Sequence, residues 1–229
     1  MGGLPATKPA ALVRSEQSLS LQRSQPTFVS RGGTKLDGAL ARLGIEVEGR
    51  SWLDAGASTG GFTDRLLQGG AVRVIALDVG YGQLDWRLRN DPRVTVLERV
   101  NVRHVKAADL PFAPEGVVAD LSFISLTLAL PALVPVAAAG ADFLLLVKPQ
   151  FEAGKKTVPR GGVVRDPSLW QTAIEKVVAC GLTQGLRLAG ASASFPPGPA
   201  GNREFFVHLR ADAAGDERVV ERALEEAGE

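Results

Sequence analysis

Lys148 stands at the end of an apolar run that has the length of a buried strand. The run covers residues 143–147, and Pro149 behind the lysine turns the chain out of any strand ladder. A lysine ammonium is costly to bury, so this position needs a reason. The chain has 19 arginines and only 7 lysines, and lysine, unlike arginine, can lose its proton. Lys148 is therefore a candidate for proton transfer.

Three aspartates occupy comparable positions along the chain. Asp54, Asp78 and Asp120 each lie at or near the end of an apolar run that is typical of a strand. Because these runs alternate with helical patterns, they predict βαβ units and a doubly wound, mostly parallel α/β sheet. Ligands of such sheets bind outside the carboxyl ends of the strands. We therefore expect a ligand site beside these aspartates and Lys148.

The elements that position these residues follow from apolar periodicity and turn residues. We expect strands at 51–56, 72–79, 94–98, 116–123, 142–147, 186–195 and 204–210, and helices at 34–44, 61–68, 83–89, 124–139, 166–180 and in the acidic tail. Thr34 is expected to cap the first helix and Gly44 to end it. A short turn joins the last two strands, which predicts an antiparallel final strand.

Composition narrows the class of protein. The 229 residues include no apolar run of membrane-spanning length and no signal-peptide pattern at the N-terminus. A single cysteine, Cys180, excludes an internal disulfide and is typical of the cytoplasm. Two histidines and one cysteine argue against a zinc site, so no metal is expected. The net charge of +1 argues neither for nor against a nucleic-acid partner.

The glycine-rich turn LDAGASTGGFTD, residues 53–64, has three interpretations. Gly56-x-Ser58-x-Gly60 matches the nucleophile elbow of hydrolases, but it follows the first strand, where no elbow is expected. A dinucleotide fingerprint would need glycine at Ser58, although the expected acidic residue is present at Asp78. Thirdly, the turn with Asp78 looks like the S-adenosylmethionine site of class I methyltransferases.

Beyond this turn, much of the chain resembles the TlyA family. The matching segments, in order, are FVSRGGTKLDGAL (28–40), LDAGASTGGFTD, ERVNVR (98–103), VADLSFISL (118–126), LLLVKPQFE (144–152), RGGVVRDP (160–167) and GPAGNREFF (198–206). These proteins are often labelled haemolysins and are similar to FtsJ-type ribose 2′-O-methyltransferases of ribosomal RNA. The resemblance implies a class I methyltransferase fold, S-adenosyl-L-methionine as cofactor, and ribosomal RNA or ribosomal subunits as partners, with cytidine as the modified nucleotide.

By this resemblance, Lys35, Asp120, Lys148 and Glu204 form a catalytic set. A ribose hydroxyl is a poor nucleophile until it loses its proton, and Lys148 would be the general base. Partial burial and the ammonium of Lys35 would favour the neutral lysine, while Asp120 and Glu204 would orient it. For any one lysine, an ion-paired or snorkelling surface residue is the alternative.

The resemblance also implies binding residues. Cofactor contacts are expected from Asp54, Gly56, Ser58, Gly60, Gly61, Phe62, Asp78, Asn101, Val102 and Asp120, and RNA phosphate contacts from Arg31, Lys155, Lys156, Arg160 and Arg165. Small residues of the turn would approach the methionine part, and Asp78 would accept from the ribose hydroxyls. A helix cap is the alternative for Asp78, and a solvated loop is the alternative for the basic residues.

The organisation of the chain has three expected parts. Residues 1–27 would be a disordered arm or the remnant of the S4-type RNA-binding domain that TlyA-like proteins carry before the SRGG stretch. Residues 28–210 would form the methyltransferase domain and residues 211–229 an acidic helix. Two other functions stay open, a membrane-active haemolysin and a non-catalytic RNA-binding protein that binds the cofactor.

Overall fold

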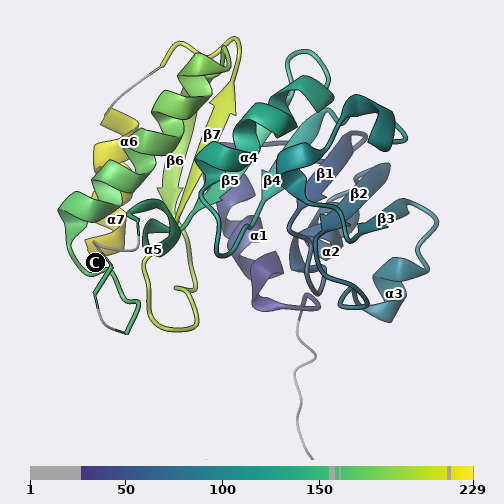
Figure 1. Ribbon diagram of the computed structural model, residues 1–229, viewed down its shortest axis with the longest axis horizontal. Coiled ribbons are helices and arrows are strands. Elements are labelled where there is room, and N and C mark those ends of the chain that lie inside the picture. Colours follow the sequence, from purple (N-terminus) through teal and green to yellow (C-terminus); the bar gives the residue numbers. More distant parts are fainter. Residues whose placement is uncertain (1–26, 155–157, 160, 216–217, 229) are drawn as a thin grey trace, which may run out of the picture.

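The protein is built on one seven-stranded sheet of order β3-β2-β1-β4-β5-β7-β6 (Figure 1). This computed structural model describes residues 27–154, 158–159, 161–215 and 218–228. The strands are β1 Ser51–Ala55, β2 Arg73–Asp78, β3 Val94–Glu98, β4 Gly116–Ala119, β5 Asp142–Val147, β6 Arg187–Ala193 and β7 Phe205–Arg210. β1 to β5 pair in parallel, whereas β7 is antiparallel to both β5 and β6. The predicted α/β class and antiparallel final strand are confirmed.

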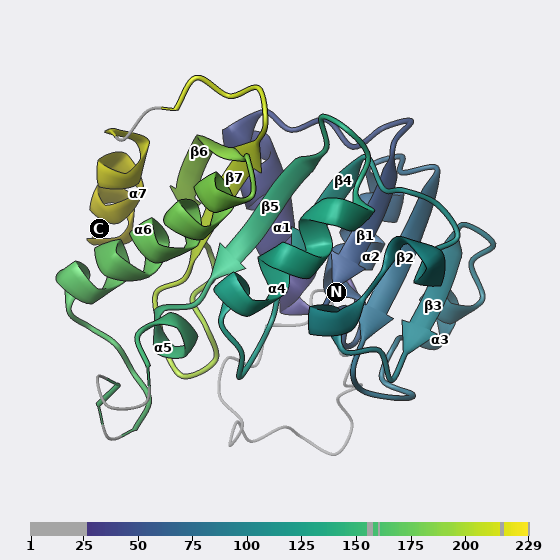
Figure 2. The same cartoon turned by 45° about the horizontal axis from the view of Figure 1, so that its top comes forward.

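Helices cover both faces of this sheet (Figures 1 and 2). They are α1 Arg31–Leu43, α2 Gly61–Gln68, α3 Trp86–Arg89, α4 Leu126–Leu133, α5 Pro149–Glu152, α6 Pro167–Thr183 and α7 Arg218–Gly228, with short 3₁₀ turns at Val102–His104, Ala107–Asp109 and Val134–Val136. One apolar core lies between the sheet and α4 and α6 and extends to α7, and a second lies under α1 and α2. β5 contributes side chains to both cores, which is why its sequence reads as one continuous apolar run.

Several element boundaries differ from the expected ones. α1 begins at Arg31, because the hydroxyl of Ser30, rather than Thr34, accepts from a first-turn amide, that of Gly32. Gly44 ends α1 in the left-handed conformation, as predicted. The fourth strand stops at Ala119 and the following helix starts only at Leu126, so a loop occupies the interval. This loop carries Asp120.

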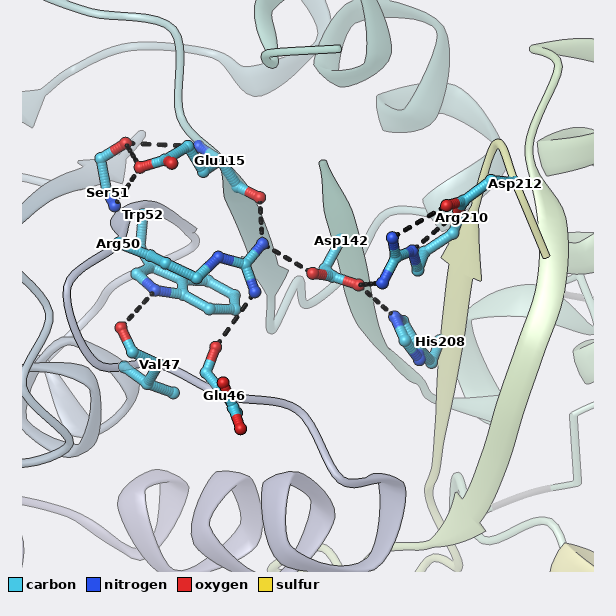
Figure 3. A network of polar contacts seen from close by, with 10 residues as sticks. All are labelled: Glu46, Val47, Arg50, Ser51, Trp52, Glu115, Asp142, His208, Arg210 and Asp212. Atoms are coloured by element: carbon cyan, nitrogen blue, oxygen red, sulfur yellow. Dashed lines mark hydrogen bonds and ion pairs between the residues drawn. The ribbon is translucent and has the colours of Figure 1, made fainter. Parts of the chain in front are cut away.

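A polar network closes the edge of the sheet where β5 begins (Figure 3). Asp142 is buried there, accepting from Arg50 at 2.6 Å and from the ring of His208 at 2.6 Å, with Arg210 at 3.5 Å. Burial alone would raise the pKa of Asp142, but the hydrogen bonds from His208 and Arg50 outweigh it and hold the pKa below its usual value. The network joins the end of β7 to the loop before β1. It lies at the opposite edge of the sheet from Lys148, which follows the last residue of β5.

None of the helices in the described part of the chain is long and apolar enough to span a bilayer. The expected arm covers residues 1–27. Of these, residues 1–26 lie outside the described residues.

Candidate active site

Strand ends bring the predicted catalytic residues to a single edge of the sheet. β1, β4 and β5 are adjacent and parallel, so Asp120 and Lys148 both follow the carboxyl ends of neighbouring strands. β7 runs the other way and pairs Phe205 with Val147, so Glu204 just before it lies at the same edge. Lys35 comes from α1, whose inward face is buried against the sheet.

The four residues form two ion pairs. The Nζ of Lys35 donates to Oε2 of Glu204 at 2.5 Å, and these side chains are only 8% and 2% exposed. The Nζ of Lys148 is ion-paired with Oδ1 of Asp120 and also donates to the hydroxyl of Ser122 at 3.1 Å. Both lysines are ion-paired, as one of the alternatives had it, but they are largely buried and so are not snorkelling surface residues.

Three cavities surround these pairs. A cavity of about 560 Å³ runs along the ends of β1 and β2 to Val100, Asn101 and Val102, and a smaller one of about 170 Å³ continues it toward α1. A third cavity of about 410 Å³ lies on the other side of Lys148 and is also lined by Glu204. The first two share four lining residues, Gly56, Ser58, Asp120 and Ser122, so they form one branched site.

The glycine turn shapes this branched site. Gly56 has φ 88°, and a Cβ there would lie 2.6 Å from the backbone oxygen of Asp120, so glycine is required. Ser58 also takes the left-handed conformation, at φ 47°. The carboxylate of Asp78 holds it there, accepting from the amides of Ser58 at 2.8 Å and Gly80 at 2.6 Å. Asp78 thus fixes the turn rather than capping a helix.

The hydrolase interpretation of this turn is not supported. The hydroxyl of Ser58 donates to the side chain of Gln83 at 3.3 Å. His208 pairs with Asp142 at the opposite edge of the sheet, and His104 is exposed in a 3₁₀ turn. Neither histidine activates Ser58.

Two residues expected to contact the cofactor lie outside both cavities of the branched site. Asp54 is fully buried, and its Oδ2 accepts from the amide of Thr63 at 2.9 Å and from its hydroxyl at 2.7 Å. Burial raises the pKa of Asp54 to about 7, against the effect of the Thr63 hydrogen bonds. Gly60 faces Leu84 and Leu88, which a Cβ would meet. Both residues hold the turn from behind, so their side-chain positions do not meet a ligand.

The other expected cofactor residues line the branched site. Gly61 and Phe62 lie in the smaller branch, and Asp78, Asn101 and Val102 in the larger one. Convergent backbone groups, two carboxylates and apolar walls suit a ligand that carries an amino acid and a nucleoside. The residues present therefore fit S-adenosylmethionine: those of the smaller branch near α1 would hold its methionine part, and those near Asn101 would hold its adenosine.

Only two of the five residues expected to contact RNA are among the described residues. Lys155, Lys156 and Arg160 lie outside the described residues. Arg31 donates to the backbone oxygen of Pro197 at 2.6 Å and so ties α1 to the loop before β7. Arg165 is exposed just before α6.

Sequence reasoning missed three residues around these cavities. Ser122 contacts Lys148, as described above. Asn202 is buried and bonds to Val164 and Gly162 at 2.9 Å each, which joins two loops that wall the cavity. Phe123 is 92% exposed at φ 64°, with its ring 5.2 Å from that of Phe151. For Ser122 and Phe123, the only available signal in the sequence was their position shortly after Asp120.

Comparison with known proteins assigns the class. A family model described as FtsJ-like methyltransferase matches residues 28–211. The fold is shared with an S-adenosylmethionine-dependent methyltransferase from Mesorhizobium loti, at a TM-score of 0.56 and 15% identity over 76% of this chain and 96% of that one. Fold and site together define a class I methyltransferase whose cofactor is S-adenosylmethionine.

More similar proteins narrow the class to one family. A Mycobacterium tuberculosis protein, the 16S/23S rRNA (cytidine-2′-O)-methyltransferase TlyA, is 51% identical over 98% of this chain and 86% of its own length. A solved structure from Lactococcus lactis, described as a hemolysin, is 43% identical with a TM-score of 0.85, covering 90% of this chain and all of that one. The chain belongs to the TlyA family of FtsJ-like RNA methyltransferases.

Proposed function

We propose that the protein transfers a methyl group from S-adenosylmethionine to the 2′-hydroxyl of a cytidine in ribosomal RNA, with ribosomal subunits as the substrate. The name of the Mycobacterium tuberculosis relative supports the nucleotide and the RNA class. One observation carries the reaction type: the Lys148–Asp120 pair lies between the branched cofactor site and the third cavity. Because ribosomes are cytoplasmic, the protein acts in the cytoplasm.

Lys148 is the general base of this proposal. The bound cofactor supplies a methyl group on a positively charged sulfur, which is a good electrophile. As a neutral amine, Lys148 accepts the proton of the 2′-hydroxyl as the oxygen becomes nucleophilic. Asp120, ion-paired with Nζ, then stabilises the resulting ammonium. Proton removal and alignment are the two effects that the site has to supply.

The ion pair of Lys35 and Glu204 belongs to the side of the site where the substrate is proposed to bind. Glu204 lines the third cavity, and its carboxylate is held by Lys35. A buried, paired carboxylate keeps a fixed direction, so Glu204 orients the ribose relative to Lys148.

The third cavity is the proposed entry of the target nucleotide. Phe151 lines this cavity, and the exposed ring of Phe123 beside it lines the larger branch of the cofactor site; a base taken out of an RNA strand can stack on such a surface. Arg31 and Arg165, together with Lys155, Lys156 and Arg160, are proposed to contact phosphates, which predicts binding that weakens with added salt. We also propose that residues 28–210 form the methyltransferase domain, with the acidic helix of residues 211–229 as its extension.

The haemolysin label of some relatives does not supply a better function. A methyltransferase family model covers most of the chain, and the cavities and ion pairs suit that chemistry. The catalytic set likewise favours an enzyme over a non-catalytic protein that only binds cofactor and RNA.

The test is incubation of the protein with labelled S-adenosylmethionine and separated small and large ribosomal subunits, followed by mapping of the modified ribose. We expect label on a cytidine 2′-oxygen. Label on a base, or none with either subunit or with naked ribosomal RNA, would overturn the proposal. Leakage of dye-filled liposomes at low protein concentration would favour the haemolysin instead.

A further inference from the structure

Ser122 occupies the point where all three cavities meet. It lines both branches of the cofactor site and also the third cavity, and among the residues described for these walls no other does so. The methyl group transferred by a methyltransferase passes from the cofactor to the substrate at such a junction. The side chain that stands there is therefore placed to influence the transfer.

The hydroxyl of Ser122 bonds to the atom that the proposed function makes the base. Nζ of Lys148 donates to it at 3.1 Å while it is also ion-paired with Asp120. A lysine nitrogen is tetrahedral, with one bond to Cε and three further directions. The hydrogen bond to Ser122 fixes one of these directions, while Asp120 attracts the nitrogen through its charge. In the neutral amine one N–H bond points at Ser122, and the lone pair takes one of the two remaining directions.

We propose that Ser122 is a positioning residue that, with Asp120, aims the lone pair of Lys148 at the 2′-hydroxyl of the substrate. The inference rests on the proposed function and deepens it. With Asp120 alone, the amine can rotate about its Cδ–Cε and Cε–Nζ bonds and still keep its ion pair. The directional hydrogen bond to Ser122 limits that freedom, and proton transfer depends steeply on such alignment.

The loop that carries Ser122 is held by hydrogen bonds at both of its ends. It starts at Asp120, whose amide donates to the oxygen of Ala55 at 3.1 Å. The loop ends at Ser125, whose hydroxyl bonds to the buried carboxylate of Glu152. Glu152 closes α5, the short helix that begins directly after Lys148, and it also accepts from the amide of Leu126 at 2.8 Å. The end of the loop that carries Ser122 is thus bonded to the short helix that follows Lys148.

The backbone conformation next to Ser122 also supports this role. Phe123 is a non-glycine residue at φ 64°, a conformation that costs free energy in most proteins. Such residues are kept where the surrounding structure needs a particular side chain in a particular direction. Here the left-handed residue directly follows the serine that faces Lys148.

The test compares Ser122→Ala, Ser122→Thr and, as a distant control, Ser168→Ala on the exposed start of α6. Measured quantities are kcat and KM for ribosomal subunits, and the affinity for S-adenosylmethionine by calorimetry. We expect Ser122→Ala to lower kcat about 10–100-fold with KM and cofactor affinity within about twofold of wild type, because only alignment is lost. Ser122→Thr keeps the hydroxyl and should recover most of kcat, and Ser168→Ala should match wild type.

A second readout does not need methyl transfer. In the protein with cofactor bound, side-chain ¹⁵N relaxation of Nζ of Lys148 should show greater mobility in Ser122→Ala than in wild type or Ser122→Thr. A wild type that leaves all ribosomal RNA unmodified would overturn the proposed function, while the relaxation experiment still reports on Ser122. Unchanged mobility in Ser122→Ala, or a loss confined to KM or cofactor affinity, would overturn the positioning role.

Discussion

The buried carboxyl of Asp54 makes stability depend on pH in an unusual direction. It is fully buried in β1, and while Thr63 bonds to Oδ2, Oδ1 has no hydrogen-bond partner among the described residues. Burial raises its pKa from 3.8 to about 7, and the nearby carboxylates of Asp120 and Asp78 act in the same direction. The folded protein therefore holds this proton more tightly than the unfolded chain does.

The sign and size of this pH effect on stability follow from the difference between the folded and unfolded pKa values of Asp54. The stabilisation is fully present below the unfolded pKa of 3.8 and is lost as the pH rises through about 7. The two pKa values differ by about 3 pH units, which corresponds to a loss on the order of 4 kcal/mol between pH 4 and pH 8. Asp54→Asn keeps an acceptor for Thr63 and carries no charge at any pH. The variant should lose this pH dependence and be the more stable protein at pH 8.

Urea unfolding of the cofactor-free protein at several pH values measures this effect. The free energy of unfolding of Asp54→Asn minus that of wild type should rise with pH between 4 and 8. Asp166→Asn is the matched control, because Asp166 is an exposed helix cap whose pKa is lowered by the hydroxyl and amide of Ser168. Its difference from wild type should change with pH only below about 4, where wild type loses the contribution of the ionised Asp166. Parallel curves for Asp54→Asn and wild type would refute the reasoning.

Three further outcomes are expected. Lys35→Met leaves the Glu204 carboxylate buried and unpaired, so the free energy of unfolding measured in urea should fall by about 3–5 kcal/mol. The double variant Lys35→Met with Glu204→Leu should recover most of this loss. A Lys35→Met variant within about 1 kcal/mol of wild type would contradict the burial of the pair. Gly56→Ala adds a clash with Asp120 to the strain of a positive φ and should abolish calorimetric cofactor binding, whereas Gly49→Ala, at φ 72° in open space, brings strain alone and should keep it. Asp78→Asn removes a charged acceptor from the Ser58 and Gly80 amides and should weaken cofactor binding at least about 10-fold; unchanged affinity would rule out its role in the site.

The strands and their ends were predictable because their signals are local. Five apolar residues followed by Lys148 and Pro149 identify a buried strand and its end from composition alone. The rule that parallel strands end at one edge then places Asp120 and Lys148 together. The position of Glu204 needed one more inference, the antiparallel direction of β7, which the short turn before it indicates.

The contacts of single side chains were not predictable in the same way. Asp54 and Gly60 lie in the same turn as Gly56, yet they face Thr63 and Leu88 rather than the cavity. Which side of a turn faces the ligand depends on its φ and ψ values, and a motif does not encode these. Ser122 was missed because its partner, Lys148, is 26 residues away along the chain. Long-range contacts of this kind arise from tertiary packing.

The central claim is that Lys148 removes the proton of the ribose hydroxyl. Lys148→Arg tests it directly, because arginine keeps the positive charge and can still pair with Asp120 but does not deprotonate in proteins. The measurement is the single-turnover rate of 2′-O-methylation with saturating cofactor and ribosomal subunits. We predict a loss of about 10²–10⁴-fold with cofactor affinity retained, and an arginine variant that methylates at the wild-type rate would contradict the account.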